Sequence, residues 1–284
     1  MRLLLLAAAS LLLCLNHAAA QGRDRYFVTS DGVRLHYLEA GPPTAHTLVF
    51  VPGWTMPAWI WVAQIQSFSN RYHVVAFDPR GQGDSGIPAA GYEPVRRGQD
   101  INELLMQLGG RPVVVIAWSL GVLDTLASIH TGGDRMLAGL VLVDNSVGEE
   151  PPPVARPVPK RRGPPPPRDV AMKQFVKAMF QRPQPEFFLN RLTETCLRTP
   201  EYASKALLAY PVPRSYWREA VYATQVPVLY MVRPRWLEQG QNLLRNRPNT
   251  ELDVFDNVGH ALFIDDAARF DRDVDSFLRR RVWP

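Results

Sequence analysis

The feature of the sequence that most constrains the fold is a serine, Ser119, that stands between two runs of different character. Residues 113–118 read VVVIAW, and residues 120–127 read LGVLDTLA. The first run is rich in β-branched residues and favours a buried strand, while the second is compatible with a helix. Ala117 and Gly121 keep the neighbouring side chains small, as a sharp strand-to-helix turn requires, because the two backbones approach closely there. We therefore predict a strained turn that exposes the serine hydroxyl.

Length and composition place the chain among ordinary globular proteins. It has 284 residues, of which 46% are hydrophobic, and a formal net charge of +5. That length fits one α/β domain with an insertion, or two small domains, with enough apolar residues for a buried core. Much of the positive excess falls in one segment, and elsewhere lysine and arginine are interleaved with acidic residues. We therefore expect no nucleic-acid-binding surface.

Apolar runs and helical patterns alternate along most of the chain. A β-hairpin is predicted over residues 26–38, buried strands over 47–51, 72–77, 113–118, 137–143, 226–232 and 251–255, and helices over 58–68, 101–108 and 267–280, besides the helix after Ser119. Strands that are apolar throughout are buried on both faces. The alternation therefore predicts an α/β fold with a mostly parallel central sheet covered by helices.

This alternation breaks between residues 145 and 225, where we expect no buried strand. Residues 151–168 hold nine prolines and five basic residues, a composition typical of a solvated linker. The alternative is a docking patch for an acidic partner or an anionic surface. Helical patterns follow over 170–181, 185–197, 201–210 and 214–224. We interpret residues 146–225 as a proline-rich loop and helical cap inserted between two core segments, 21–145 and 226–284.

The first twenty residues have the pattern of a secretory signal peptide. Arg2 precedes an apolar stretch over 3–15 that is too short to span a bilayer comfortably, and three alanines ending at Ala20 form a cleavage site. We expect cleavage after Ala20, export to the periplasm or the medium, and no integral membrane span afterwards. An uncleaved anchor and a lipid-modified Cys14 are the alternatives. Cleavage would leave Cys196 as the one cysteine, which predicts a buried apolar side chain and no internal disulfide.

Two further segments hold residues that could complete a site around Ser119. His260 follows the last predicted strand and a glycine, and it is the best placed of the six histidines to act as a general base, because imidazole is neutral near pH 7. Residues 52–55 read PGWT after an early strand, so a tight turn there would let the backbone amide of Trp54 face the site. With the amide of Leu120, it would supply two donors for a developing oxyanion.

A glycine-rich loop over residues 78–86, DPRGQGDSG, closes another predicted strand. It lacks the Gly-x-Gly-x-x-Gly pattern that opens a helix in dinucleotide-binding proteins, so that function is excluded. We expect Asp78 and Arg80 to pin the loop. No group of histidine, cysteine and acidic residues has metal-ligand spacing in the sequence, and we expect neither a metal nor a cofactor.

Together, the loop over 78–86, the AWSLG segment over 117–121 and the GHALF segment over 259–263 resemble the α/β-hydrolase family. They are most similar to its cofactor-free serine branch, which includes carboxylesterases, enol-lactonases and non-haem chloroperoxidases. The resemblance covers about residues 26–145 and 226–280. It implies a central sheet of about eight strands with the cap over the site, and a nucleophilic Ser119. A serine at that position argues against haloalkane dehalogenases and most epoxide hydrolases, which use an aspartate.

The acid of the catalytic triad is where this sequence departs from that family. The family usually places the acid in the loop after the strand predicted at 226–232, but residues 233–236 read RPRW and no carboxylate occurs before Glu238. Its alternative position follows the preceding strand, where Asp144 stands, and neighbouring strands end only about 5 Å apart. We therefore expect Asp144 to orient His260, with Glu238 as the second choice. Asp124 is expected to lie too deep beneath the serine.

These residues predict acyl transfer by an exported serine hydrolase that cleaves carboxylic esters or lactones. Ser119 would attack the carbonyl with His260 as base, and His260 would then activate water to release the acid. One alternative is a non-catalytic exported binding protein on a hydrolase scaffold. Another is a perhydrolase or C–C bond hydrolase that uses the same triad.

The substrate is less constrained by the sequence. Trp118, Phe175 and Trp217 are candidates to line an apolar or aromatic pocket for a small-molecule ester or lactone. The aromatic residues of the cap could equally serve only to join it to the sheet. Arg233 and Arg235 would lie at the rim of the site, where they could favour acidic substrates.

Overall fold

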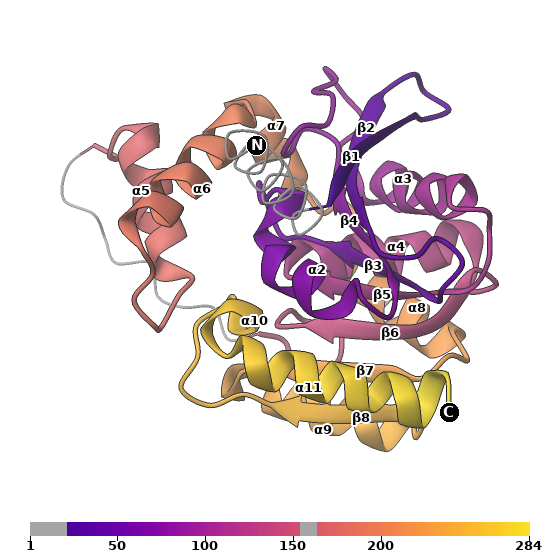
Figure 1. The fold of residues 1–284 in the computed structure, drawn as a ribbon. Coiled ribbons are helices and arrows are strands. Elements are labelled where there is room, and N and C mark those ends of the chain that lie inside the picture. Colours follow the sequence, from indigo (N-terminus) through magenta and orange to yellow (C-terminus); the bar gives the residue numbers. More distant parts are fainter. Residues whose placement is uncertain (1–21, 154–163) are drawn as a thin grey trace, which may run out of the picture.

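A single eight-stranded sheet forms the centre of the molecule (Figure 1). The computed structural model describes residues 22–153 and 164–284, so the predicted signal peptide and most of the proline-rich segment lie outside the described residues. The strands follow the order β1-β2-β4-β3-β5-β6-β7-β8. Their bounds are β1 Arg23–Val28, β2 Arg34–Ala40, β3 Thr47–Val51, β4 His73–Asp78, β5 Val113–Trp118, β6 Leu137–Val143, β7 Val228–Val232 and β8 Thr250–Val254.

All neighbouring strands from β4 through β8 run parallel, and the pairs β1–β2 and β2–β4 are antiparallel. The expected mostly parallel sheet of about eight strands is therefore confirmed. Parallel strands end at the same edge, so the residues that follow β3, β5, β6, β7 and β8 gather at one end of the sheet.

Helices cover both faces of the sheet, which is why its strands are apolar on both sides. The side chains of β5 alternate: Val113, Val115 and Ala117 pack into one apolar cluster, while Val114, Ile116 and Trp118 pack into the other. The first face carries α3 (Pro94–Gln107), α4 (Leu120–Gly132) and α9 (Leu237–Asn246); the second carries α2 (Val62–Phe68) and α11 (Ala267–Phe277). Three short elements, η1 (Ala58–Trp61), η2 (Pro234–Trp236) and η3 (Leu278–Val282), and the single turn α10 (Leu262–Asp265) complete the core.

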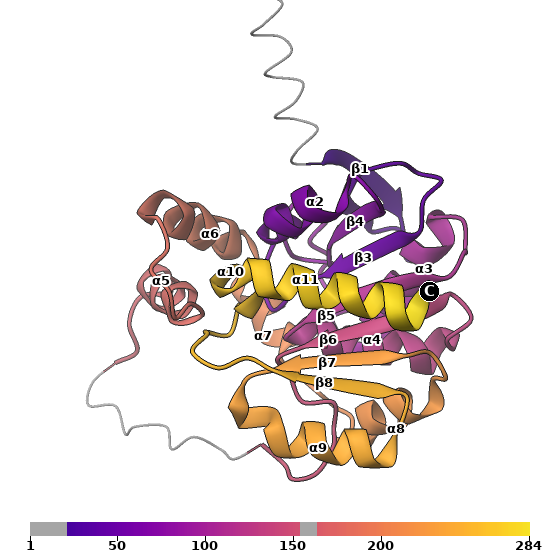
Figure 2. The ribbon, with the colours of Figure 1, turned by 60° about the horizontal axis from the view of Figure 1, so that its bottom comes forward.

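Four helices lie between β6 and β7: α5 (Arg168–Ala178), α6 (Glu186–Arg198), α7 (Glu201–Leu207) and α8 (Ser215–Ala223). Figures 1 and 2 show α5 and α6 standing off the end of the sheet toward which its parallel strands point. In contrast, α8 packs beside α4 and helps to cover a face of the sheet. Cys196 of α6 is buried beside Met56 and, in the part of the chain that the structure describes, is a free thiol.

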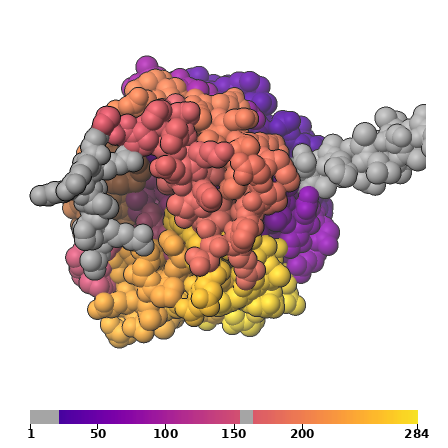
Figure 3. Space-filling model, turned by 90° about the vertical axis from the view of Figure 1, so that its left-hand side faces the viewer, coloured from indigo at the N-terminus to yellow at the C-terminus, as the bar shows by residue number. Residues whose placement is uncertain are grey.

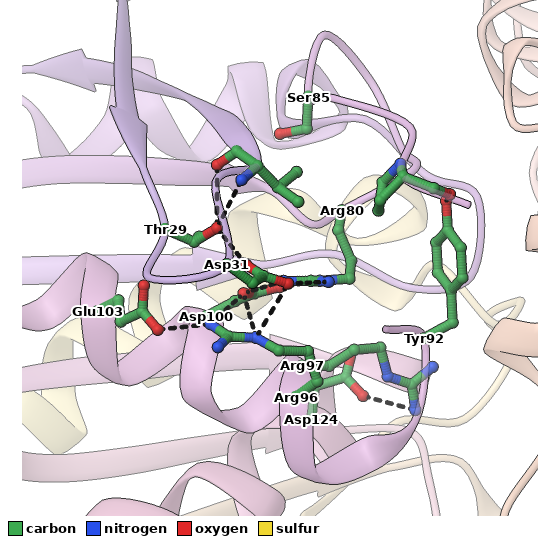
Figure 4. A network of polar contacts seen from close by, with 12 residues as sticks. Thr29, Asp31, Arg80, Ser85, Tyr92, Arg96, Arg97, Asp100, Glu103 and Asp124 are labelled. Atoms are coloured by element: carbon green, nitrogen blue, oxygen red, sulfur yellow. Dashed lines mark hydrogen bonds and ion pairs between the residues drawn. The ribbon is translucent and has the colours of Figure 1, made fainter. Parts of the chain in front are cut away.

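The glycine-rich loop after β4 is held by buried charges, as the sequence led us to expect (Figure 4). The fully buried guanidinium of Arg80 pairs with Asp100 of α3 and with Asp31 of the hairpin turn. Asp78 accepts hydrogen bonds from His36 and from the backbone amides of Ala58 and Asp84. These contacts tie the hairpin, the loop and α3 into one rigid unit.

Two helices differ from what the sequence predicted. Helix α3 begins at Pro94 and not near residue 101, because its first turns bury Arg97, Gly98 and Asp100 in place of apolar side chains. Helix α9 was not predicted at all, since its buried face includes Gln239 and Gly240. In both helices, polar residues and glycine on the buried face interrupt the regular spacing of apolar residues by which a helix is recognised. Among residues 22–153 and 164–284, no helix has the length and apolarity to cross a membrane.

Candidate active site

Ser119 occupies the turn between β5 and α4, as predicted. Its backbone has φ 54° and ψ −120°, a conformation that is uncommon for a residue with a side chain. The turn is fixed from both sides: the Ser119 amide donates to Val143 O, and the Asn145 side chain donates to Ser119 O. A Cβ on Gly121 would lie 2.6 Å from Val51 O, so α4 and β3 can approach this closely only with glycine there.

His260 connects the serine to a carboxylate. Its Nε2 lies 2.8 Å from Ser119 Oγ, and its Nδ1 lies 2.6 Å from Asp144 Oδ2. With Nδ1 protonated and donating to Asp144, Nε2 is free to accept the proton of the serine hydroxyl. The structure therefore brings together the three residues that the sequence nominated, from the ends of β5, β6 and β8.

Asp144 follows β6 directly, and its side chain is fully buried. Its φ is 48°, and its amide donates to Met231 O of the neighbouring strand. The amide of Arg233 donates to Oδ1 at 3.0 Å, and Arg233 Nε donates to Oδ2 at 2.7 Å. Burial raises the pKa of the Asp144 carboxyl, but the bond from His260 and the charge of Arg233 outweigh it and hold that pKa below its ordinary value.

The loop that carries His260 is braced by both the sheet and the cap. Trp118 Nε1 donates to His260 O at 2.8 Å. The buried carboxylate of Asp265 accepts the amide of Gly259 and the amide of Gln181, which lies in the α5–α6 connection, each at 2.6 Å. One carboxylate therefore joins the cap to the residue before His260.

The turn after β3 lies against the serine. A Cβ on Gly53 would be 3.0 Å from Ser119 Cβ, which shows how closely the two segments approach. In the described part of the chain, neither the Trp54 amide nor the Leu120 amide takes part in a hydrogen bond. Leu120 is the first residue of α4, so its amide has no partner within the helix. Both amides remain candidates for an oxyanion hole.

The three predicted pocket residues lie in different surroundings. Phe175 of α5 meets the ring of Trp54 edge-on, with centroids 5.1 Å apart, which places it beside the candidate oxyanion turn. Trp118 is buried against the ring of His260. Trp217 is also buried, but it donates to Leu123 O and so fastens α8 to α4. Figure 3 views the molecule from the side on which α5 and α6 lie. It shows a hollow between the cap helices and the C-terminal segments, with atoms of the central part of the chain at its bottom.

The two other acids considered from the sequence do not contact His260. Glu238 is exposed in the first turn of α9. Asp124 is buried within α4 and pairs with Arg97, as expected for a position beneath the serine. Among these carboxylates, the bond to His260 Nδ1 is made by Asp144.

One group of side chains in the described ranges could hold a metal ion by proximity alone. Ligand atoms of His36, Asp78 and Asp84 lie within 4.8 Å of one another. However, His36 Nδ1 is bonded to Asp78, and Nε2 lies 3.0 Å from Asp24, so both ring nitrogens already face carboxylates. These contacts serve the pinned loop after β4.

Sequence reasoning missed two residues of the site. Arg233 was considered only as part of a rim, and Asp265 was not considered. A carboxylate five residues after the histidine was the available signal for Asp265, but its backbone partners in the cap, Gln181 and Arg182, are more than 80 residues away in the sequence. Only the folded chain identifies them.

Comparison with known proteins shows the family to which the chain belongs. Residues 48–272 match the model of a family described as "Alpha/beta hydrolase family". A soluble epoxide hydrolase from Corynebacterium sp. (strain C12) is 34% identical over 91 residues, which are 32% of this chain and 31% of that protein. A non-heme chloroperoxidase from Streptomyces lividans is 36% identical over 116 residues, which are 40% of this chain and 42% of that protein. The chain thus spans less than half the length of these curated relatives.

Solved structures resemble nearly the whole fold. An esterase from Rhodococcus sp. ECU1013 has a TM-score of 0.76 at 21% identity, covering 91% of this chain and 99% of that one. A bromoperoxidase from Bacillus anthracis has a TM-score of 0.75 at 19% identity, covering 90% of this chain and 100% of that one. Such identities establish the fold alone, whereas the family model covers well over half of the sequence. The chain belongs to the alpha/beta hydrolase family.

Proposed function

We propose that the protein is a serine hydrolase that cleaves carboxylic esters or lactones through an acyl-enzyme. The observation that carries this proposal is the unbroken relay from Ser119 Oγ to His260 Nε2 and from His260 Nδ1 to Asp144, at 2.8 and 2.6 Å. Such a relay removes the serine proton as the hydroxyl attacks a carbonyl carbon.

The reaction would run in two steps. Ser119 Oγ bonds to the carbonyl carbon, its proton passes to His260 Nε2, and the amides of Trp54 and Leu120 stabilise the oxyanion. His260 then gives that proton to the leaving alkoxide, which departs as the alcohol. Water, activated by the same nitrogen, attacks the acyl-enzyme and releases the acid. Asp144 stays ionised and stabilises the imidazolium in both steps.

The names of similar proteins support the hydrolase class but differ on the bond that is cleaved. Esterases are among the structural neighbours, and epoxide hydrolases are among the curated relatives. We favour esters because a serine stands where most epoxide hydrolases, by the family resemblance, carry an aspartate. We further propose export, which rests on the sequence pattern of residues 1–20 alone.

The decisive experiment combines active-site labelling with turnover. We expect stoichiometric modification of Ser119 by a fluorophosphonate, lost in His260→Ala, together with turnover within a panel of p-nitrophenyl esters, lactones and an epoxide. Asp144→Asn should lower kcat by about 10³-fold or more, because the neutral amide cannot hold the correct tautomer of His260. Glu238→Gln is the matched control and should leave kcat within two-fold.

Three outcomes would contradict parts of this proposal. Asp144→Asn turnover within a factor of a few of the wild type would remove Asp144 from the triad. Folded protein that resists the fluorophosphonate would favour the non-catalytic binding protein. Faster turnover of the epoxide than of any ester or lactone would reject the ester-bond assignment.

A further inference from the structure

The loop after β7 contains an arginine at the place where this family usually carries the acid of its triad. We propose that Arg233 is a positioning residue that holds Asp144 in its reactive orientation and places a positive charge beside the Nδ1 atom of His260. The inference rests on the proposed function, because it concerns the same Ser119–His260–Asp144 relay.

The first part of the argument is geometric. Arg233 binds Asp144 at both oxygens, with its backbone amide 3.0 Å from Oδ1 and its Nε 2.7 Å from Oδ2. Two donors from one residue leave the carboxylate little freedom to rotate. Asp144 itself is buried and strained, with φ 48°. The loop thus supplies donors that fix a carboxylate from the neighbouring strand.

The second part of the argument is electrostatic. Asp144 Oδ2 accepts both Arg233 Nε and His260 Nδ1, and Arg233 Nη2 lies only 3.4 Å from that ring nitrogen. A carboxylate beside an imidazole favours the imidazolium, whereas a guanidinium at this distance disfavours it. The charge of Arg233 therefore counteracts the electrostatic effect of Asp144 on the imidazole ring. We therefore expect removal of this charge to change the pH dependence of the reaction at Ser119 Oγ.

The other charged groups near the His260 loop do not reproduce this effect. Asp265 of α10 accepts the backbone amides of Gly259 and Gln181. Arg182 of the cap lies 3.7 Å from Asp266. From the β5 side, the neighbours of His260 are the neutral hydroxyl of Ser119 and the ring of Trp118. Substitution of Arg233 would leave all of these groups in place.

This geometry also bears on the idea of a cationic rim. The guanidinium of Arg233 is directed at Asp144, and only 21% of its side chain is exposed. Its charge is thus paired with Asp144 and does not face the solvent at the rim. Equal relative rates for neutral and anionic esters in the wild type and in Arg233→Gln would agree with this assignment.

The test follows the rate of fluorophosphonate labelling of Ser119 between pH 5 and 9 in the full-length protein, so it requires no knowledge of the natural substrate. Arg233→Met and Arg233→Gln remove the charge, and thermal melts establish that at least one of them is folded. In these variants we expect the acid limb of the labelling rate to move to higher pH by about one unit or more.

Arg233→Lys separates charge from geometry. It keeps the positive charge but loses the rigid fork, so we expect its acid limb near that of the wild type and its plateau rate lowered several-fold. Arg245→Met is the control for loss of an arginine, because Arg245 is exposed on α9, the helix that follows this loop; neither the limb nor the plateau should change.

Labelling of Arg233→Met and Arg233→Gln with an acid limb at the wild-type pH would overturn this inference and leave the proposed function intact. A limb that moves equally in Arg233→Lys would also overturn it, because charge would then not be the cause. Absence of labelling in the folded wild type at every pH would overturn the proposed function, and the inference with it.

Discussion

Asp124 should make the stability of the protein fall as the pH rises from 4 to 7. This carboxyl lies in α4, five residues after Ser119, and is fully buried. Arg97 Nη2 is 3.0 Å from Oδ1, but that oxygen accepts no hydrogen bond from any described residue. Figure 4 shows Asp124 facing Arg97. Burial prevails over the charge of Arg97 and raises the pKa of Asp124 to about 6.

The size and sign follow from proton binding. The ordinary pKa of this carboxyl is 3.8 and its folded value is about 6, so between these values the folded state binds more protons than the unfolded state. Stability must then decrease as pH rises through that window. With 1.36 kcal/mol per pKa unit, the carboxyl costs about 2 kcal/mol between pH 4 and pH 7.

Asp124→Asn tests this reasoning, because it removes the titration and keeps the volume. Urea unfolding at pH 4, 5.5 and 7 gives the free energy of unfolding of both proteins. Relative to the wild type, the variant should gain about 2 kcal/mol on going from pH 4 to pH 7. Any constant cost of leaving Arg97 without its partner cancels in this comparison.

Met106→Gln, an uncharged substitution at an exposed position of α3, is the control, and its difference from the wild type should stay constant with pH. A difference between Asp124→Asn and the wild type that is equally constant would refute the reasoning.

Two further predictions concern other buried charges. Arg80→Met removes the main partner of the buried Asp100 carboxylate, so it should lower the free energy of unfolding by about 3 kcal/mol. The double variant Arg80→Met/Asp100→Asn should recover part of this loss, and no recovery would argue against a charge effect. Asp265→Asn weakens the acceptor that joins the cap to the His260 loop, so the plateau of fluorophosphonate labelling should drop by about 10-fold. Asp266→Asn should stay within two-fold, and equal losses in the two variants would contradict the role given to Asp265.

Much of the fold could be predicted because each parallel strand is buried on both faces and therefore has an apolar sequence of its own. The strands over 113–118 and 137–143 match β5 and β6 to the residue. Helices were harder where their buried face is polar. Helix α3 buries Arg97 and Asp100, and α9 buries Gln239, so hydrophobic periodicity marked neither correctly.

The residues of the candidate site also differ in how well the sequence predicted them. The sequence by itself determined the turn at Ser119, because small neighbours between an apolar run and a helix are a local requirement. It also nominated His260 and Asp144, since Asp144 directly follows one strand and His260 lies in the loop after another, in a sheet whose parallel strands end together.

Only the tertiary structure decided how these groups are held. Arg233 binds Asp144 across 89 residues of sequence, and Asp265 joins the His260 loop to a cap connection more than 80 residues away. A hydrogen bond depends on distance and direction between atoms, and the spacing of residues along the chain records neither. The sequence could therefore name the reacting groups, whereas the contacts that orient them and set their electrostatic environment exist only in the folded protein.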